Sequence, residues 1–100
     1  MIKIEYSEPF LKDLKKLKKT TNYSTIKKLC FEELPQYKSL SHIKNLKKIQ
    51  GYKKYYRIRV GDYRVGLKDE GDTIVAMRVL HRKDIYRSFP NPQSKKRNAG

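Results

Sequence analysis

A cluster of arginines marks the stretch from Tyr55 to Leu67, which reads YYRIRVGDYRVGL. Gly61-Asp62 is a two-residue turn of the kind that joins antiparallel strands. With this turn the register of the hairpin is fixed, and Arg59 lies opposite Arg64. Like charges that face each other destabilise a sheet, whereas an arginine fork binds phosphate with paired hydrogen bonds. The facing arginines therefore predict a site for a phosphate or another anion.

A third strand extends this predicted site. The residues EGD at 70–72 have the form of a three-residue loop with a central glycine, which would bring the following strand alongside. The expected surface then has two rows across three strands: Arg59–Arg64–Arg78, and beside it Arg57–Gly66–Ala76, a positive edge next to a floor of small residues.

The alternative interpretation is a solvated basic face that only keeps the sheet soluble. All the arginines lie in the second half of the chain, while the basic residues among the first 50 are lysines. Lysine would be sufficient for solubility, and arginine is the better ligand for phosphate. The sorting of the two residue types favours an anion site in the second half.

The segment LHRKDIYRSF, from Leu80 to Phe89, adds further candidates. Arg82 has the same parity as Arg78 and would extend the basic face. His81 is a candidate for proton transfer near neutral pH, or a strand-end residue that caps backbone groups. Tyr86 is a candidate for stacking on an unpaired base, or an aromatic residue of the core. Weaker RNA-binding candidates at the edges of this surface are Lys53, Lys54 and Arg87.

The surrounding pattern predicts the elements that hold these residues. We expect a strand over 2–6, helices over 7–17 and 24–34, strands over 46–50, 54–60, 63–69 and 73–80, and a helical turn within 82–89. The expected core face of the sheet carries Tyr56, Ile58, Val60, Tyr63, Val65, Leu67, Val75, Met77 and Val79.

These elements predict an α+β fold. Two N-terminal helices pack on one face of a small curved antiparallel β-sheet, and a short C-terminal helix follows. The expected domain spans 1–90, and 91–100 has the composition of a disordered basic tail.

Composition narrows the class of protein. The 100 residues carry 25 Lys and Arg against 10 Asp and Glu, a net charge of +15, which suits a polyanionic partner. Cys30 is the single cysteine, so an internal disulfide is excluded. The sequence has no membrane span, signal peptide or metal-ligand spacing, which predicts a cytoplasmic protein without a metal or small-molecule cofactor.

In its ordered set of motifs the chain resembles the RelE/ParE toxin superfamily, in particular the RelE-like mRNA interferases. The resemblance rests on basic residues at Arg57 and Arg59, on GDYR at 61–64, on HR at 81–82 and on IY at 85–86. It covers nearly the whole chain up to Pro90.

The resemblance implies an endoribonuclease that cuts mRNA in the ribosomal A site without a metal. Its partners would be mRNA, the ribosome with its rRNA, and an acidic antitoxin encoded beside it. The RNA's own 2′-OH would attack the adjacent phosphorus. The implied catalytic residues are Arg59, Arg64, Arg82, His81 and Tyr86, with Arg57 at a position where relatives often have lysine.

Two other functions stay open. A ParE-like toxin would use the same scaffold to inhibit DNA gyrase and would need no nuclease residues. A non-catalytic nucleic-acid-binding module, or a relic that only binds its antitoxin, would keep the basic surface without the chemistry. The presence of Arg64, Arg82 and Tyr86 together favours the nuclease.

Overall fold

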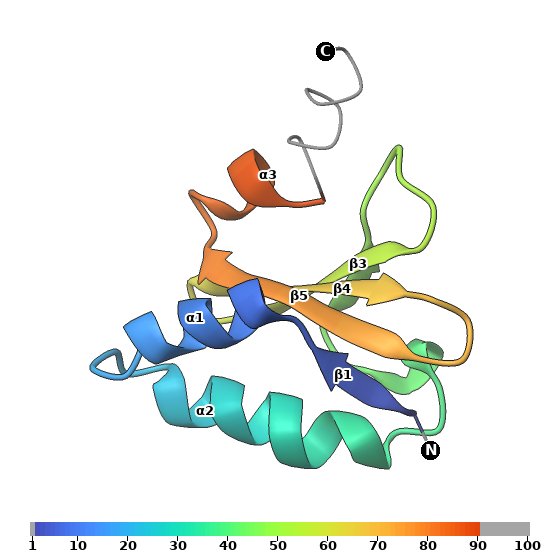
Figure 1. The fold of residues 1–100 in the computed structure, drawn as a ribbon, viewed down its shortest axis with the longest axis horizontal. Coiled ribbons are helices and arrows are strands. Elements are labelled where there is room, and N and C mark those ends of the chain that lie inside the picture. The colour runs from blue at the N-terminus through green and yellow to red at the C-terminus, as the bar shows by residue number, and fades with distance from the viewer. Residues whose placement is uncertain (1, 91–100) are drawn as a thin grey trace.

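The protein, seen here as a computed structural model, folds into one twisted sheet with helices on both sides (Figure 1). The structure describes residues 2–90, so the tail predicted to be disordered lies outside the described residues. The strands are β1 (Ile4–Tyr6), β2 (Leu46–Lys48), β3 (Tyr55–Val60), β4 (Tyr63–Asp69) and β5 (Ile74–His81), and the helices are α1 (Glu8–Lys16), α2 (Tyr23–Lys28) and α3 (Ile85–Ser88).

The sheet has the strand order β1-β5-β4-β3-β2. Strands β2 to β5 form the predicted antiparallel meander. The first strand, however, pairs in parallel with β5, so the sheet is mixed and the expectation of an all-antiparallel sheet was wrong. No tight turn joins β1 to β5, and only such a turn would have fixed their relative direction from the sequence.

The two N-terminal helices begin where the sequence predicts. The Ser7 side chain caps α1 by accepting a hydrogen bond from the Phe10 N–H at 3.1 Å. The second predicted helix is continuous but changes its winding: a π-helical turn (Leu29–Glu33) and a 3-10 turn (Leu34–Gln36) follow α2. Its core residues are spaced by four, which exceeds the 3.6 residues of an α-helical turn. The wider turn keeps them on one side: Ile26, Cys30 and Leu34 are all fully buried.

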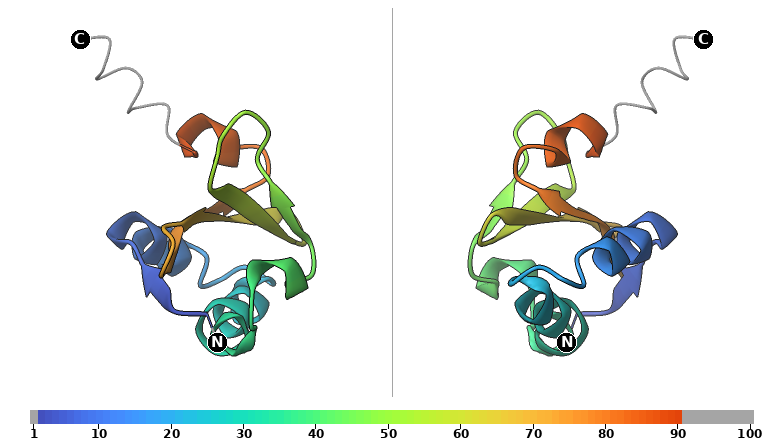
Figure 2. Two further views of the ribbon diagram at one scale, coloured as in Figure 1. Left: turned by 90° about the vertical axis from the view of Figure 1, so that its right-hand side faces the viewer. Right: turned by 90° about the vertical axis from the view of Figure 1, so that its left-hand side faces the viewer.

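The main core lies between these helices and one face of the sheet, as predicted. Figure 2 shows α1 and α2 on one side of the sheet and α3 on the other. Burial raises the pKa of the Cys30 thiol to about 12, so this cysteine is a packing residue. The buried cluster is formed by Phe10, Leu14, Ile26, Cys30, Leu34, Ile43, Ile58, Val65, Leu67, Ile74, Ala76 and Val79.

The pairing of β4 with β5 differs from the predicted register. Leu67 lies opposite Ala76 and Val65 opposite Val79, so β5 carries one extra residue between these pairs. Such a β-bulge reverses the alternation of side chains along its strand. Ile74 and Ala76 therefore belong to the main core cluster, and the expectation that Val75 and Met77 would take these places was wrong. Val75 is nevertheless buried, at 9% exposure.

Candidate active site

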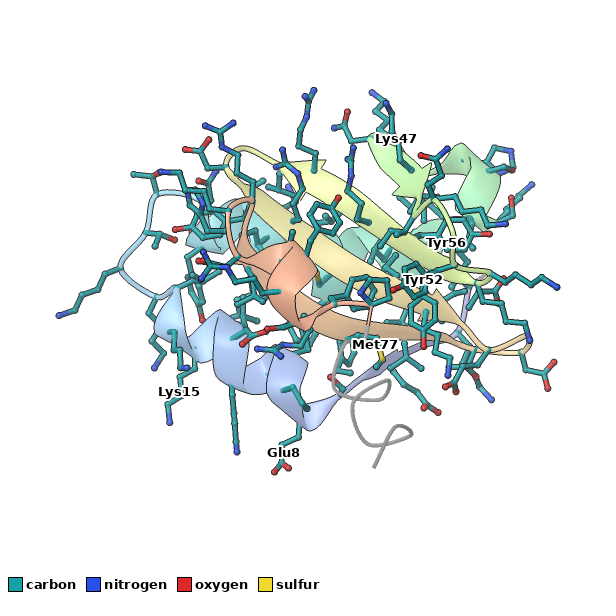
Figure 3. The ribbon with its side chains drawn as sticks, turned by 90° about the horizontal axis from the view of Figure 1, so that it is seen from above. Glu8, Lys15, Lys47, Tyr52, Tyr56 and Met77 are labelled. Atoms are coloured by element: carbon teal, nitrogen blue, oxygen red, sulfur yellow. The ribbon has the colours of Figure 1, made fainter. Side chains whose placement is uncertain are left out.

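The β3–β4 hairpin has the predicted register, with Arg59 opposite Arg64 and Arg57 opposite Gly66. Gly61 takes a φ of +59°, as the first position of a type II′ turn requires. The three arginines project from the face of the sheet that is turned away from α1 and α2, which we call the arginine face. Figure 3 looks down on this face, with Lys47 at one edge and Lys15 on α1 at the other.

Arg64 is the centre of the site. Its Nη1 donates hydrogen bonds to the backbone oxygens of Gly61 and Tyr63, each at 3.0 Å, so the guanidinium is anchored at the turn. Burial, followed by the positive charges of Arg57 and Arg59, lowers the pKa of Arg64. A bound anion would remove this repulsion.

Arg82, the first residue after β5, approaches the same point, and its positive charge also lowers the pKa of Arg64. Its backbone N–H donates a hydrogen bond to the backbone oxygen of Asp62 at 2.7 Å. Its side-chain Nε lies 3.8 Å from the Asp62 carboxylate. The side chain is 58% exposed and can reach a ligand. The Asp62 carboxylate therefore lies at the rim of the site. The sequence predicted Asp62 only as a turn residue, so this position was missed.

Tyr86 completes the group, which we call the arginine cluster: Arg57, Arg59, Arg64 and Arg82 with Tyr86. The ring is 54% exposed, and Tyr86 acts electrostatically on Arg64. With Arg57 it lines a hollow of about 340 Å³ beside β2, whose other walls are Lys47, Lys48, Ile49 and Gln50. The β2 lysines were missed as site residues, although the alternation of the predicted strand 46–50 was a signal for them.

The short helix α3 holds Tyr86 between two buried anchors. Ile85 is 0% and Phe89 1% exposed, and the Phe89 ring packs edge-on against Tyr55 with centroids 5.5 Å apart. The Phe89 ring also covers Gly66, where an added Cβ would lie 2.7 Å from Cε2 of the ring. The predicted open floor of small residues was therefore wrong, because Phe89 fills it at Gly66 and the bulge turns Ala76 into the core.

Arg78 does not join the arginine row. The bulge places Arg78 opposite Gly66, and Leu80 instead of Arg78 lies opposite Arg64. The Arg78 guanidinium binds the buried Asp13 carboxylate of α1 through Nε at 2.7 Å and Nη2 at 3.0 Å. Two nitrogens of the Arg78 guanidinium are therefore hydrogen-bonded within the protein, and Arg78 is not counted among the anion-binding residues.

His81 lies on the other side of the sheet from the arginine cluster. It pairs with Tyr63, and their rings pack edge to face with centroids 5.5 Å apart. Its Nδ1 accepts a hydrogen bond from the Lys83 N–H at 3.1 Å. This arrangement matches the strand-end capping role and not a role beside the arginines.

The weaker candidates lie at the periphery. Arg87 is 80% exposed and its Nη1 is 3.9 Å from Asp84. Lys53 lines a separate hollow in the 48–53 loop, and Lys54 adopts a φ of +69° while its backbone oxygen accepts from Asp69. None of the described contacts brings these three residues to Arg64.

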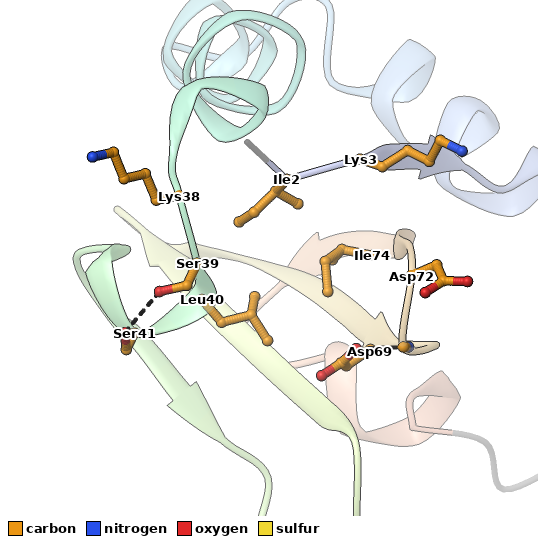
Figure 4. A pocket seen from close by; sticks show the side chains of 10 residues that line it. Ile2, Lys3, Lys38, Ser39, Leu40, Ser41, Asp69, Asp72 and Ile74 are labelled. Carbon is orange, nitrogen blue, oxygen red and sulfur yellow. Dashed lines mark hydrogen bonds between the residues drawn. The ribbon is translucent and has the colours of Figure 1, made fainter.

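A further hollow, of about 440 Å³, opens beside the start of β1 and β5 (Figure 4). Its walls carry both signs of charge, from Lys3 and Lys38 and from Asp69 and Asp72, and no arginine lines it. It is distinct from the arginine cluster.

Within residues 2–90, no helix is long and apolar enough to cross a bilayer.

Comparison with solved structures identifies the class of protein that this fold and site define. A chain of the crystal structure of the RelB-RelE antitoxin-toxin complex from Methanococcus jannaschii superimposes with a TM-score of 0.69 and 45% identity, covering 86% of this chain and 99% of that chain. A chain of the E. coli DinJ-YafQ complex, 21% identical, has the same fold with a TM-score of 0.68, covering the same shares.

Sequence comparison agrees. The family model described as the ParE toxin of type II toxin-antitoxin system, parDE, matches residues 4–86. A protein named Toxin RelE3, from Methanocaldococcus jannaschii, is 47% identical over 90 residues, covering 89% of this chain and all of that protein. The chain belongs to the ParE toxin family of type II toxin–antitoxin systems and is RelE-like, as the motifs predict.

Proposed function

We propose that this toxin is a ribosome-dependent endoribonuclease that cleaves mRNA in the ribosomal A site, in the cytoplasm, without a catalytic metal. The observation that carries the proposal is the convergence of four arginines and an exposed tyrosine on the arginine face. Arginine forks suit the non-bridging oxygens of a phosphodiester, and an exposed ring suits an unstacked base.

The chemistry uses the RNA's own nucleophile. The 2′-hydroxyl loses its proton as its oxygen attacks the adjacent phosphorus, the bond from phosphorus to the 5′-oxygen breaks, and the 5′-oxygen takes up a proton. The products are a 2′,3′-cyclic phosphate and a 5′-OH. The protein has to align these atoms and stabilise the charge of the pentacoordinate phosphorane. Neither task requires a metal when fixed cations surround the phosphate.

Each member of the arginine cluster has a role in this scheme. Arg59 and Arg64 bind the phosphoryl oxygens, and the anchoring of Arg64 at the turn fixes its direction in advance. Arg82, which is exposed and approaches from the other strand, stabilises the departing 5′-oxygen. Tyr86 stacks on a base, and Arg57 beside it holds a neighbouring phosphate. We assign His81 no part in this scheme, because its ring packs against Tyr63 and no described contact joins it to the arginine cluster.

An antitoxin would restrain this activity. Three of the similar structures are described as complexes of a toxin with an antitoxin. We propose that the antitoxin of this chain is acidic and lays carboxylates on the arginine cluster, where they replace phosphate oxygens. Charge complementarity of this kind speeds association and makes it sensitive to salt.

The test is cleavage of a defined mRNA on purified ribosomes, with the cut positions read by primer extension. Cuts confined to A-site codons, and absent without ribosomes, would support the proposal. The matching family model is described as the ParE toxin of parDE, so the same preparation is tested for trapping of gyrase–DNA complexes. Intact mRNA together with trapped gyrase would favour the gyrase inhibitor, and neither activity would favour the non-catalytic module.

A further inference from the structure

The bulge in β5 decides which side of the sheet Arg82 occupies. Core-facing residues alternate up to Ala76, and continued alternation would turn residues 78, 80 and 82 into the core as well. The extra residue, Met77, shifts this pattern, so that Val79 faces the core while Leu80 lies opposite Arg64 on the arginine face. Arg82, two residues further on, follows Leu80 to the arginine face. The meeting of Arg82 with Arg64 therefore depends on the bulge.

The first helix supplies the hydrogen bonds that hold this bulge. Beyond Ala76 the outer edge of β5 has no strand beside it, because β1 ends at Tyr6. Ser7 takes over: its N–H donates to the Ala76 oxygen at 3.0 Å and its Oγ donates to the Met77 oxygen at 2.8 Å. Asp13 then accepts the Val79 N–H at 3.1 Å.

Asp13 is a carboxylate buried to 3% exposure, and its three hydrogen bonds all go to β5. Besides the Val79 N–H, it accepts two from the Arg78 guanidinium, which raise the pKa of Arg78. A buried carboxylate is costly unless it is fully paired. Asp13 thereby binds both residues that follow Met77, namely Arg78 through its side chain and Val79 through its N–H.

We propose that Asp13 is a positioning residue for the cleavage reaction: by holding the bulge at Met77 from α1, it directs Arg82 toward Arg64. Asp13 has no contact with the arginine cluster and acts only through β5. The inference rests on the proposed nuclease function and adds a residue that the arginine motifs do not contain.

The alternative is that the Asp13–Arg78 pair only stabilises the fold. A double-mutant cycle separates the two roles, because a residue that acts through Arg82 has nothing left to position once Arg82 is removed. The variants are D13N, R82A and the double variant. E8Q is the matched control, since it also removes an acidic charge from α1 but lies exposed in the first turn.

Cleavage is measured on ribosomes across a range of toxin concentrations. We expect D13N to lower the saturating rate by about tenfold or more, because a small misplacement of a catalytic group has large effects, with little change in the half-saturating concentration. In the R82A background the same substitution should change the rate by less than about twofold. An equal loss in both backgrounds, or no loss from D13N, would overturn the proposal.

Amide exchange gives a readout that does not need cleavage. The Arg82 N–H donates to Asp62 and the Arg59 N–H to Asn45, so the second serves as an internal reference. We expect D13N to speed exchange of the Arg82 amide selectively, and E8Q to leave both amides unchanged. Unchanged exchange at Arg82 in D13N would refute the positioning role, whereas a wild-type protein that fails to cleave would refute the proposed function. Should D13N not fold, S7A replaces it, since Ser7 binds the same bulge.

Discussion

Arg64 is surrounded by positive charge from two strands, and its guanidinium is already hydrogen-bonded to the turn. We predict that Arg64→Ala folds with undiminished stability, because the substitution relieves repulsion, but loses about 10²-fold or more in cleavage rate, as for removal of a transition-state contact. Primer extension on ribosomes measures the rate, and thermal unfolding measures the stability.

The matched control is Arg87→Ala, which removes an arginine that is 80% exposed and pairs only weakly with Asp84. It should cleave nearly as fast as the wild type. Equal rates for Arg64→Ala and wild type would show that the phosphate binds elsewhere.

His81 lies against Tyr63 on the side of the sheet away from the arginine cluster. We therefore predict that His81→Gln cleaves at close to the wild-type rate and keeps the same dependence on pH between 6 and 8, since no proton passes through the imidazole. The measurement is the cleavage rate across this pH range. A loss as severe as that of Arg64→Ala would restore His81 as an acid or base.

The short helix α3 is fixed to the sheet because the Phe89 ring, which directly follows it, packs on Gly66. An added Cβ at Gly66 would come within 2.7–2.8 Å of three ring atoms, and such overpacking costs about 1–3 kcal/mol. We predict that Gly66→Ala lowers the free energy of unfolding by this order, measured in urea, and slows cleavage because Tyr86 shifts with α3.

A smaller side chain at position 89 supplies the control. The double variant Gly66→Ala with Phe89→Leu should recover part of the lost rate, because the space for the methyl group returns. If Gly66→Ala alone proved as stable and as active as the wild type, Phe89 would not be seated there.

Local signals explain what the sequence could predict of these elements. The Gly61-Asp62 turn and strict alternation fix the register of the β3–β4 hairpin, so the facing of Arg59 and Arg64 was predicted correctly. The bulge at Met77 has no such signal, since neither glycine nor proline marks it. The residues of β5 before the bulge were therefore assigned to the wrong faces, Ala76 among them, and Arg78 was paired with Arg64 instead of Gly66. Val79 and Arg82, beyond the bulge, lie on the predicted sides.

Contacts between distant segments were also beyond the sequence. A three-residue strand such as β1 carries too little pattern to name its neighbour, and β5 lies some 70 residues away. Two contacts depend on how the helices dock on the sheet. The Phe89 ring packs on Gly66, and Asp13 of α1 binds Arg78. Propensity and alternation do not encode that docking.

Across the whole molecule, the net charge of +15 favours association with a polyanionic partner. We predict that co-expression with the product of a neighbouring gene yields a complex whose affinity falls steeply as salt rises. The reason is that salt ions screen the attraction between the antitoxin's carboxylates and the arginine cluster. The measurement is the dissociation constant across a salt series, with Arg57→Ala as a variant that should weaken both the affinity and its dependence on salt. No complex, or an affinity indifferent to salt, would argue against an acidic inhibitor on this face.

In the proposed reaction the arginine cluster holds a phosphodiester while the RNA's own 2′-OH cuts it. The most direct measurement places a single 2′-deoxy nucleotide in the A-site codon of an otherwise unchanged mRNA and compares its cleavage on ribosomes with that of the all-ribose mRNA. We expect the all-ribose mRNA to be cut to a 2′,3′-cyclic phosphate and a 5′-OH, and the cut 3′ of the deoxy position to disappear. Cleavage at the deoxy position at an unchanged rate would contradict this reaction.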